Sequence, residues 1–187
     1  MSIVKFFRHQ AKDISFKNLF IIWFEDVFGT LVRYIPGITG WVLRYYFYKL
    51  VLKKISGFCY IHTNVRFVHS YNIELGRRIG INYGCQFLGR GGIRIGNNCQ
   101  FGPYVVVISY DHVYYERDIT IDEQGYVYKP IIMEDDVWVG AHAVIMPGVV
   151  LKKGTVIGAG AVVTKSTEEY GIYVGNPAQF FKKRNAV

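Results

Sequence analysis

Cysteine is scarce in this sequence of 187 residues, and no two cysteines are closely spaced. The three thiols, Cys59, Cys85 and Cys99, are an odd number and lie far apart, unlike the ligands of a zinc ribbon or the pair of a redox motif. We therefore expect a reduced compartment. The sequence also lacks a charged start followed by an apolar run and a small-residue cleavage site, so we expect no signal peptide and a cytoplasmic protein.

Long uncharged runs are missing as well. The most apolar part of the chain, residues 16–54, is interrupted by Glu25 and Asp26, and its longest uncharged stretch falls well short of the ~20 residues of a spanning helix. This part is rich in Phe, Tyr, Trp and Leu, and Pro36 and Gly37 divide it into two predicted helices. We expect residues 1–54 to form a helical, basic and aromatic leader.

The formal net charge of +8 is concentrated in the leader. Residues 1–54 hold nine Lys and Arg against three Asp and Glu, which leaves six of the eight excess charges there. These cations accompany Trp, Leu and Ile and form no recognisable recognition element, so nucleic-acid binding is not expected. Three roles stay open for the leader: a cap on the following domain, a segment at a membrane surface, or a contact between subunits.

A six-residue period starts near Ile61 and dominates the rest of the chain. Six residues provide one short strand and one corner, so three units close a triangular coil whose first-position side chains point inward. Cys85 and Cys99 lie at the fifth position, which predicts that both are buried. About four coils are expected, enough for a self-supporting solenoid. The period is clearest at the first positions Met133, Val139, Ile145, Leu151, Ile157 and Val163.

The period is interrupted between Val107 and Ile131. The interruption contains an Asp-His pair, Asp111 and His112, followed closely by Tyr114. We expect residues 109–130 to leave the coils as an excursion loop, whose side chains line an acceptor pocket or pack the loop against the coils. Asp111 is expected either to orient His112 or to cap a turn.

The stretch DDVWVGAHAVIMPGVVLKKGTVIGAGAVVTKS, followed by VGNPAQFFKKR, resembles the hexapeptide-repeat acyltransferases. It is similar to the galactoside and maltose O-acetyltransferases, and especially to the acetyltransferases of surface-polysaccharide synthesis. The resemblance covers residues 61–184 and implies an all-β fold, a left-handed parallel β-helix over residues 55–187 that ends in a C-terminal tail. It also implies acetyl-CoA as co-substrate, no metal, and a homotrimer with active sites between subunits.

The resemblance also implies roles for residues at matching positions. His112 corresponds to a general base that takes the proton of an acceptor hydroxyl, and the amide of Ala141 to a donor that faces the thioester oxygen. The candidates for coenzyme binding are Trp138, Gly140, Ala159, Gly160, Thr164, Lys165 and Arg184. The candidates for acceptor binding are Asn82, Asp111, Tyr114 and His142.

Some of these residues also have plainer explanations. Asn82 suits a corner turn, His142 an ordinary surface position, and Trp138 a packed interface. The acceptor side departs from the maltose-type enzymes, because Gly84 stands where a second, sugar-contacting Asn is found in them. This departure favours a larger or lipid-linked acceptor, on a membrane-bound carrier, over a small free sugar.

The expected function is therefore acetyl-CoA-dependent O-acetylation of a sugar or glycan precursor in surface-polysaccharide synthesis. Two alternatives stay open: acetylation of a small molecule such as an antibiotic or amino sugar, and a non-catalytic β-helix scaffold. A zinc enzyme of the carbonic anhydrase type needs three converging imidazoles. It is disfavoured, because close spacing on adjacent coils is missing among His62, His69, His112 and His142.

Overall fold

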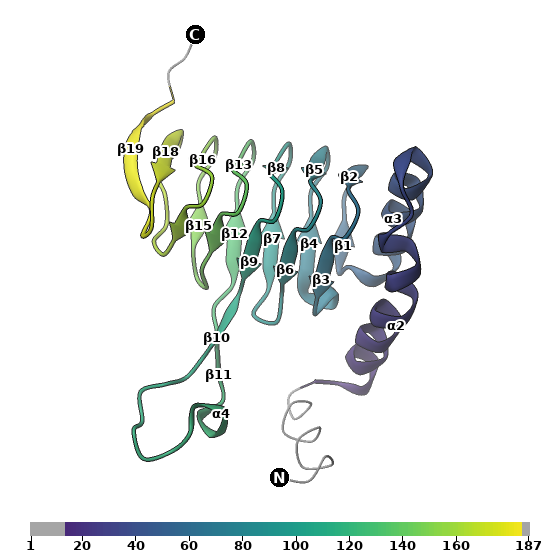
Figure 1. The fold of residues 1–187 in the computed structure, drawn as a ribbon, viewed down its shortest axis with the longest axis horizontal. Helices are drawn as coiled ribbons and strands as arrows, with labels where there is room; N and C mark the ends of the chain where they lie inside the picture. Colours follow the sequence, from purple (N-terminus) through teal and green to yellow (C-terminus); the bar gives the residue numbers. More distant parts are fainter. Residues whose placement is uncertain (1–13, 185–187) are drawn as a thin grey trace.

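Strands of two to five residues alternate with tight corners from Lys54 onward in the computed structural model, which describes residues 14–184. The strands form three main sheets, and successive turns of the chain stack into a three-sided β-helix (Figure 1). The predicted hexapeptide-repeat solenoid with an N-terminal helical segment is confirmed. The start of the predicted leader, residues 1–13, and the end of the predicted tail, residues 185–187, lie outside the described residues.

Each coil visits three sheets in turn, called here sheets A, B and C. Sheet A contains β1 (Lys54–Ile55), β4 (Ile73–Leu75), β7 (Ile93–Ile95), β12 (Ile131–Met133) and β15 (Val150–Leu151). Sheet B contains β2 (Cys59–Ile61), β5 (Ile79–Ile81), β8 (Gln100–Phe101), β13 (Trp138–Val139), β16 (Val156–Ile157), β18 (Gly171–Val174) and β19 (Gln179–Lys183). Sheet C contains β3 (Arg66–Val68), β6 (Gln86–Leu88), β9 (Val106–Ile108), β14 (Val144–Ile145) and β17 (Val162–Val163). Neighbouring strands are parallel except β18 and β19.

The corners are named after the sheets that they join: A–B, B–C and C–A. Equivalent residues of the B–C corner all have a positive φ, from +57° to +73°, at Asn64, Gly84, Tyr104, His142 and Gly160. A left-handed residue turns the chain sharply, which explains why Asn and Gly recur at this step of the repeat. Successive corner residues therefore lie above one another along the solenoid.

Three insertions into the repeat all lie at the C–A corner. The first is the 3-10 turn η1 (Ser70–Asn72) between β3 and β4, and the second is the Gly-rich link of residues 89–92 between β6 and β7. The third is the excursion, residues 109–130, between β9 and β12. In the sequence, the six-residue period slips by two residues before Leu75 and again before Ile95. The insertions that cause these slips lie at the same edge as the excursion.

Side chains of the first hexad position fill the interior. Phe67 stacks on Phe87 with ring centroids 5.0 Å apart, and Phe87 meets Phe101 edge to face at 5.3 Å. The predicted burial of Cys85 and Cys99 is confirmed, and burial raises the pKa of each thiol to about 11. The inward first positions, each at most 3% exposed, are Ile61, Phe67, Leu75, Ile81, Phe87, Ile95, Phe101, Val107, Met133, Val139, Ile145, Leu151, Ile157 and Val163.

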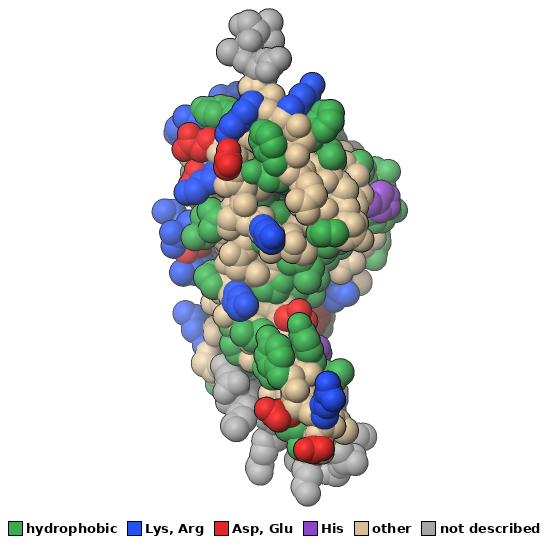
Figure 2. Space-filling view, turned by 90° about the vertical axis from the view of Figure 1, so that its left-hand side faces the viewer, with side chains coloured by type: hydrophobic (Ala, Val, Ile, Leu, Met, Phe, Trp, Pro, Cys, Tyr) green, Lys and Arg blue, Asp and Glu red, His purple; other side chains and the backbone are tan. Residues whose placement is uncertain are grey.

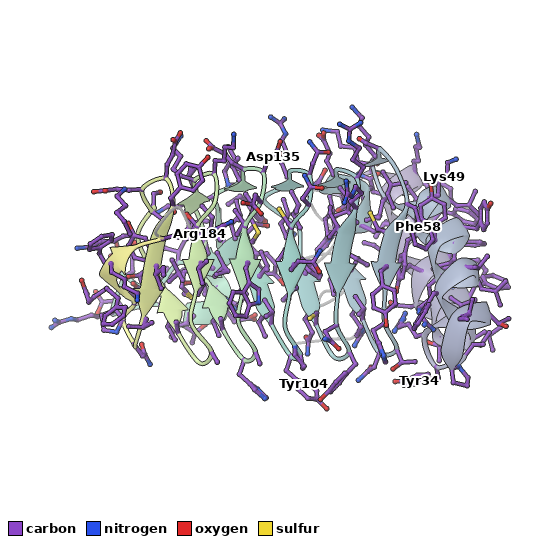
Figure 3. All side chains as sticks on the ribbon, turned by 90° about the horizontal axis from the view of Figure 1, so that it is seen from above. Tyr34, Lys49, Phe58, Tyr104, Asp135 and Arg184 are labelled. Carbon is purple, nitrogen blue, oxygen red and sulfur yellow. The ribbon has the colours of Figure 1, made fainter. Side chains whose placement is uncertain are left out.

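Two helices, α2 (Phe16–Arg33) and α3 (Gly37–Val51), cover the open end of the first coil (Figures 1 and 3). The hydroxyl of Tyr48 donates to the carbonyl of Val65 at 2.8 Å, and Nε of Arg44 donates to the carbonyl of Ile61 at 2.9 Å. Backbone groups at the edge of the first coil thereby gain partners without a further strand. No helix among the described residues is long and apolar enough to cross a membrane.

Candidate active site

The excursion begins as a β-hairpin that projects from the body of the solenoid (Figure 1). Its strands are β10 (Tyr110–His112) and β11 (Tyr126–Tyr128), and its tip contains the short helix α4 (Ile121–Gln124). His112 pairs with Tyr126 across the hairpin, and their ring centroids lie 4.4 Å apart. The side chain of Gln124 donates to the carbonyl of Glu116 at 2.9 Å and accepts from its amide at 3.0 Å. The imidazole of His112 is exposed, and hydrogen bonds between Gln124 and Glu116 stabilise the loop of the hairpin that carries it.

Asp111 has a partner that limits its role. Its Oδ1 accepts a hydrogen bond from the backbone amide of His112 at 2.9 Å. The carboxylate therefore caps the neighbouring amide, as a turn Asp does. The prediction that Asp111 also contacts the acceptor stays a prediction.

A cluster of rings surrounds the base of the hairpin, and sequence reasoning missed it. Nδ1 of His69 lies 2.9 Å from the hydroxyl of Tyr71. The guanidinium of Arg90 lies 4.9 Å from the ring centroid of Tyr126 and 5.3 Å from that of Tyr128. Burial, helped by the nearby Arg90 charge, lowers the pKa of His69 to about 4, so its imidazole is neutral at pH 7. The slips of the period before Leu75 and Ile95 mark this edge in the sequence, but they indicate none of these contacts.

The B–C corner presents a row of backbone amides to the outside. In the first two coils these amides are occupied, because Nδ1 of His62 accepts from Thr63 at 2.8 Å and Oδ1 of Asn82 accepts from Tyr83 at 3.0 Å. In the third coil the equivalent residue is Pro103, which has no amide hydrogen.

The later coils differ at this corner because glycine precedes the outward amide. Gly140 comes before Ala141 and Gly158 before Ala159, so neither amide has a preceding side chain that could cap it. Among the described groups, no hydrogen-bond acceptor is paired with the amide of Ala141 or of Ala159. A Cβ on Gly160 would meet no other atom within 4 Å. Two free donors and open space thus lie side by side at the corner where the coenzyme is predicted.

Other predicted residues lie at or beside the same corner. Trp138 is 55% exposed on β13, two residues before Gly140. The imidazole of His142 stacks on the ring of Tyr104, with centroids 5.1 Å apart and planes 22° apart. Asn82 lies two coils away, where its side chain serves the corner turn. Their predicted contacts with coenzyme or acceptor stay predictions.

The predicted phosphate ligands occupy two further corners. Thr164 and Lys165 follow β17 at the C–A corner, and both are exposed. Arg184 lies near the C-terminal end of the solenoid at the A–B corner (Figure 3), where Nη1 contacts Oδ2 of Asp136 at 3.0 Å. A phosphate at Arg184 would compete with that carboxylate.

One chain therefore holds the two halves of the predicted site apart. His112 belongs to the C–A corner, and the free amides of Ala141 and Ala159 belong to the B–C corner, on the other side of sheet C. Within residues 14–184, no three His, Cys, Asp or Glu side chains gather as a metal site would require. An open hollow of about 500 Å³ beside Phe58 and Arg77 contains none of the predicted site residues.

Comparison with known proteins supports the class that this repeat and fold define. Residues 130–165 match the profile of the family described as "Bacterial transferase hexapeptide (six repeats)". In structure, the chain is similar to a hexapeptide-repeat-containing acetyltransferase of Vibrio cholerae O1 biovar eltor complexed with acetyl coenzyme A. The TM-score is 0.83 with 20% identity over 92% of each chain, a likeness of fold.

Many curated proteins match in sequence, and two of them illustrate the likeness. A protein of Schizosaccharomyces pombe, proposed by its name to be an acetyltransferase, is 36% identical over 66% of this chain and 58% of its own length. The galactoside O-acetyltransferase of Escherichia coli (strain K12) is 30% identical over 67% of this chain and 61% of its own length. The chain thus spans less than two thirds of either relative. The resemblance to hexapeptide-repeat acyltransferases, predicted from the sequence, is confirmed.

Proposed function

We propose that this protein is an O-acetyltransferase that moves the acetyl group of acetyl-CoA directly to a hydroxyl of a sugar or glycan precursor. The observation that carries the proposal is the pair of uncapped amides at Ala141 and Ala159, because the same corner position is capped or lacks a hydrogen in the three preceding coils. Polar donors left open beside Gly160 suit the amide and thioester carbonyls of a coenzyme arm. The relatives named as acetyltransferases agree with this chemistry.

The proposed reaction needs one base and one oxyanion donor. His112 takes the proton of the acceptor hydroxyl while the oxygen attacks the thioester carbonyl. The amide of Ala141 donates to the oxyanion of the tetrahedral intermediate. Collapse of the intermediate breaks the carbon–sulfur bond, and the proton on His112 passes to the departing thiolate. The products are the acetyl ester and free coenzyme A.

We assign the coenzyme to the B–C corner and its neighbourhood. Its pantetheine arm would lie along Gly140, Ala159 and Gly160, beside Trp138. The proposed phosphate ligands are Thr164 and Lys165 at the C–A corner and Arg184 at the A–B corner. Because one chain holds these corners apart, a neighbouring copy would supply at least one of them.

We further propose that a second copy of the chain completes each site, as expected for a homotrimer. The two halves of the site lie on opposite sides of sheet C, whose outward side chains include the half-buried Val106, Ile108, Val144 and Val162. An aliphatic sheet face between two polar half-sites suits a contact with another subunit.

The excursion also presents apolar side chains toward a neighbour. Tyr114 is 60% and Tyr115 70% exposed, and Figure 2 shows hydrophobic side chains over this projecting part of the molecule. We assign Tyr114 to the acceptor pocket that forms when the excursion meets a second copy. Asp111, His142 and Asn82 remain proposed acceptor contacts around it.

The test is the variant His112→Ala. Turnover of acetyl-CoA with a glycan acceptor should fall about 10²- to 10⁴-fold, because the hydroxyl loses its base. Coenzyme affinity, measured by calorimetry, should not change. Mass spectrometry of candidate glycans after incubation with acetyl-CoA identifies the acceptor. Transfer by His112→Ala at the wild-type rate would remove His112 from the mechanism.

The matched control is Asp111→Asn. Asparagine keeps the Oδ1 acceptor that holds the His112 amide and loses the negative charge. Because Oδ1 stays available to the His112 amide and to an acceptor hydroxyl, kcat should stay within about 3-fold of wild type. A loss as large as that of His112→Ala would show instead that the charge of Asp111 acts on the imidazole.

A further inference from the structure

The two helices at the N-terminal end have an apolar face turned away from the solenoid. On α2 and its C-cap residue Tyr34, a stripe with helical spacing contains Phe16, Phe20, Trp23, Val27, Leu31 and Tyr34, all exposed. On α3, Ile38, Val42, Tyr46 and Leu50 continue at four-residue intervals. Leu31, Ile38 and Leu50 are 67%, 71% and 75% exposed. We call these ten side chains the outer face.

Covering the first coil does not account for this surface. The opposite sides of the helices perform that task, with Phe47, Tyr48 and Val51 buried against the first coil. Figure 3 shows side chains of both helices extending beyond the end of the solenoid. Single exposed apolar residues are ordinary, but a continuous stripe over two packed helices marks a surface with a partner.

The charges around the outer face indicate what that partner is. Lys17 and Lys49 are exposed on the same helices, and no carboxylate among the described residues pairs with either. The exposed Asp26 pairs with Arg66 at 3.5 Å, so the nearby acid is already partnered. Residues 1–54 carry nine cations and three acids. A symmetric contact with a second copy would set this basic surface against an equally basic one.

We propose that the outer face binds an anionic lipid bilayer, with α2 and α3 lying in the plane of the interface. Trp23, Tyr34 and Tyr46 have the amphipathic rings that favour headgroup depth, and Leu31 and Ile38 supply aliphatic surface for the acyl region. The lysines then meet the negative headgroups. The same two helices close the solenoid on one side and hold the protein at a membrane on the other.

Flotation of the full chain with vesicles tests the inference. Wild type should float with vesicles of phosphatidylglycerol and phosphatidylcholine and should stay at the bottom with phosphatidylcholine alone. Leu31→Glu/Ile38→Glu should lower binding to anionic vesicles at least about 10-fold, because two charges enter the apolar layer. Lys17→Gln/Lys49→Gln should weaken binding about 5-fold per lysine. The matched control is Phe181→Glu, which changes a 62% exposed side chain on β19 at the far end.

Each variant must first melt and sediment like wild type. If Leu31→Glu/Ile38→Glu reduces the mass of the assembly, the outer face is a contact between copies and the proposal is wrong. The proposal also fails if wild type does not float, or if the outer-face variant floats as well as wild type. His112 lies on β10 and is not part of the outer face, so His112→Ala should float like wild type. The flotation result is therefore independent of the proposed reaction.

Discussion

At the residue scale, the side chain before an outward amide decides whether that amide is free. His62 and Asn82 bond the amide that follows each of them, at 2.8 and 3.0 Å, and Gly140 has no side chain to do so. The sequence predicted Ala141 as a donor through resemblance alone. The physical reason, a missing cap, required the corner geometry.

The buried carboxyl of Glu25 on α2 makes the stability of the fold depend on pH. Burial raises the pKa of its carboxyl from 4.5 to about 7, with smaller opposing effects of Ser70 and Arg33. Between these two pH values the unfolded chain loses the proton while the folded chain keeps it. Stability from this group is therefore full below pH 4.5 and is lost as pH rises through about 7.

We predict that Glu25→Gln removes this loss. The free energy of unfolding of the variant, relative to wild type, should rise by up to about 3 kcal/mol between pH 4.5 and 8. Both proteins should be titrated with urea at each pH. The lowered pKa of His69 makes the folded state more stable as pH rises over an overlapping range, and this effect cancels in the difference between the two proteins. A difference that does not change with pH would show that Glu25 is not held protonated.

At the element scale, the B–C corner offers a way to delete one amide without disturbing the coil. Pro103 occupies the position of Ala141 one coil earlier, so the corner backbone accepts proline. The carbonyl oxygen at this position keeps its hydrogen bond when the residue is proline. The oxygen of Pro103 accepts from the amide of His142 at 2.9 Å, as that of Ala141 accepts from the amide of Gly160 at 2.8 Å. Proline at 141 would remove only the hydrogen that is proposed to face the oxyanion.

We predict that Ala141→Pro lowers kcat about 10²- to 10³-fold with little change in melting temperature. The control, Ala159→Pro, removes the neighbouring amide and should raise KM for acetyl-CoA more than it lowers kcat. Steady-state kinetics with varied acetyl-CoA distinguish the two. A folded Ala141→Pro protein with normal kcat would exclude this amide as the oxyanion donor.

The elements themselves differ in how far sequence could predict them. The coils follow from local periodicity, so Val139 and Ile145 could be placed inward from the six-residue pattern alone. The cluster at the base of the hairpin could not, because its contacts join His69, Arg90 and Tyr126 from three separate insertions. The position of Arg184 beside Asp136 likewise depends on the path of the last strand.

At the scale of the whole molecule, the fold separates residues that the chemistry requires together. His112 projects from the C–A corner and Ala141 lies at the B–C corner, with sheet C between them. The sequence resemblance predicted sites between subunits, and this separation is the structural argument for them. Closed rings of identical chains place one corner of each copy against a different corner of the next.

The central claim, a site shared between copies, is tested most directly by mixing two inactive variants. Co-expressed His112→Ala and Ala141→Pro chains, carrying different tags, form mixed assemblies that can be purified through both tags. In a trimer that carries both tags, about a third of the sites combine an intact His112 with an intact Ala141 from the neighbouring copy. The account predicts that the mixture recovers about that fraction of wild-type activity. A mixture as inactive as either variant alone would contradict it.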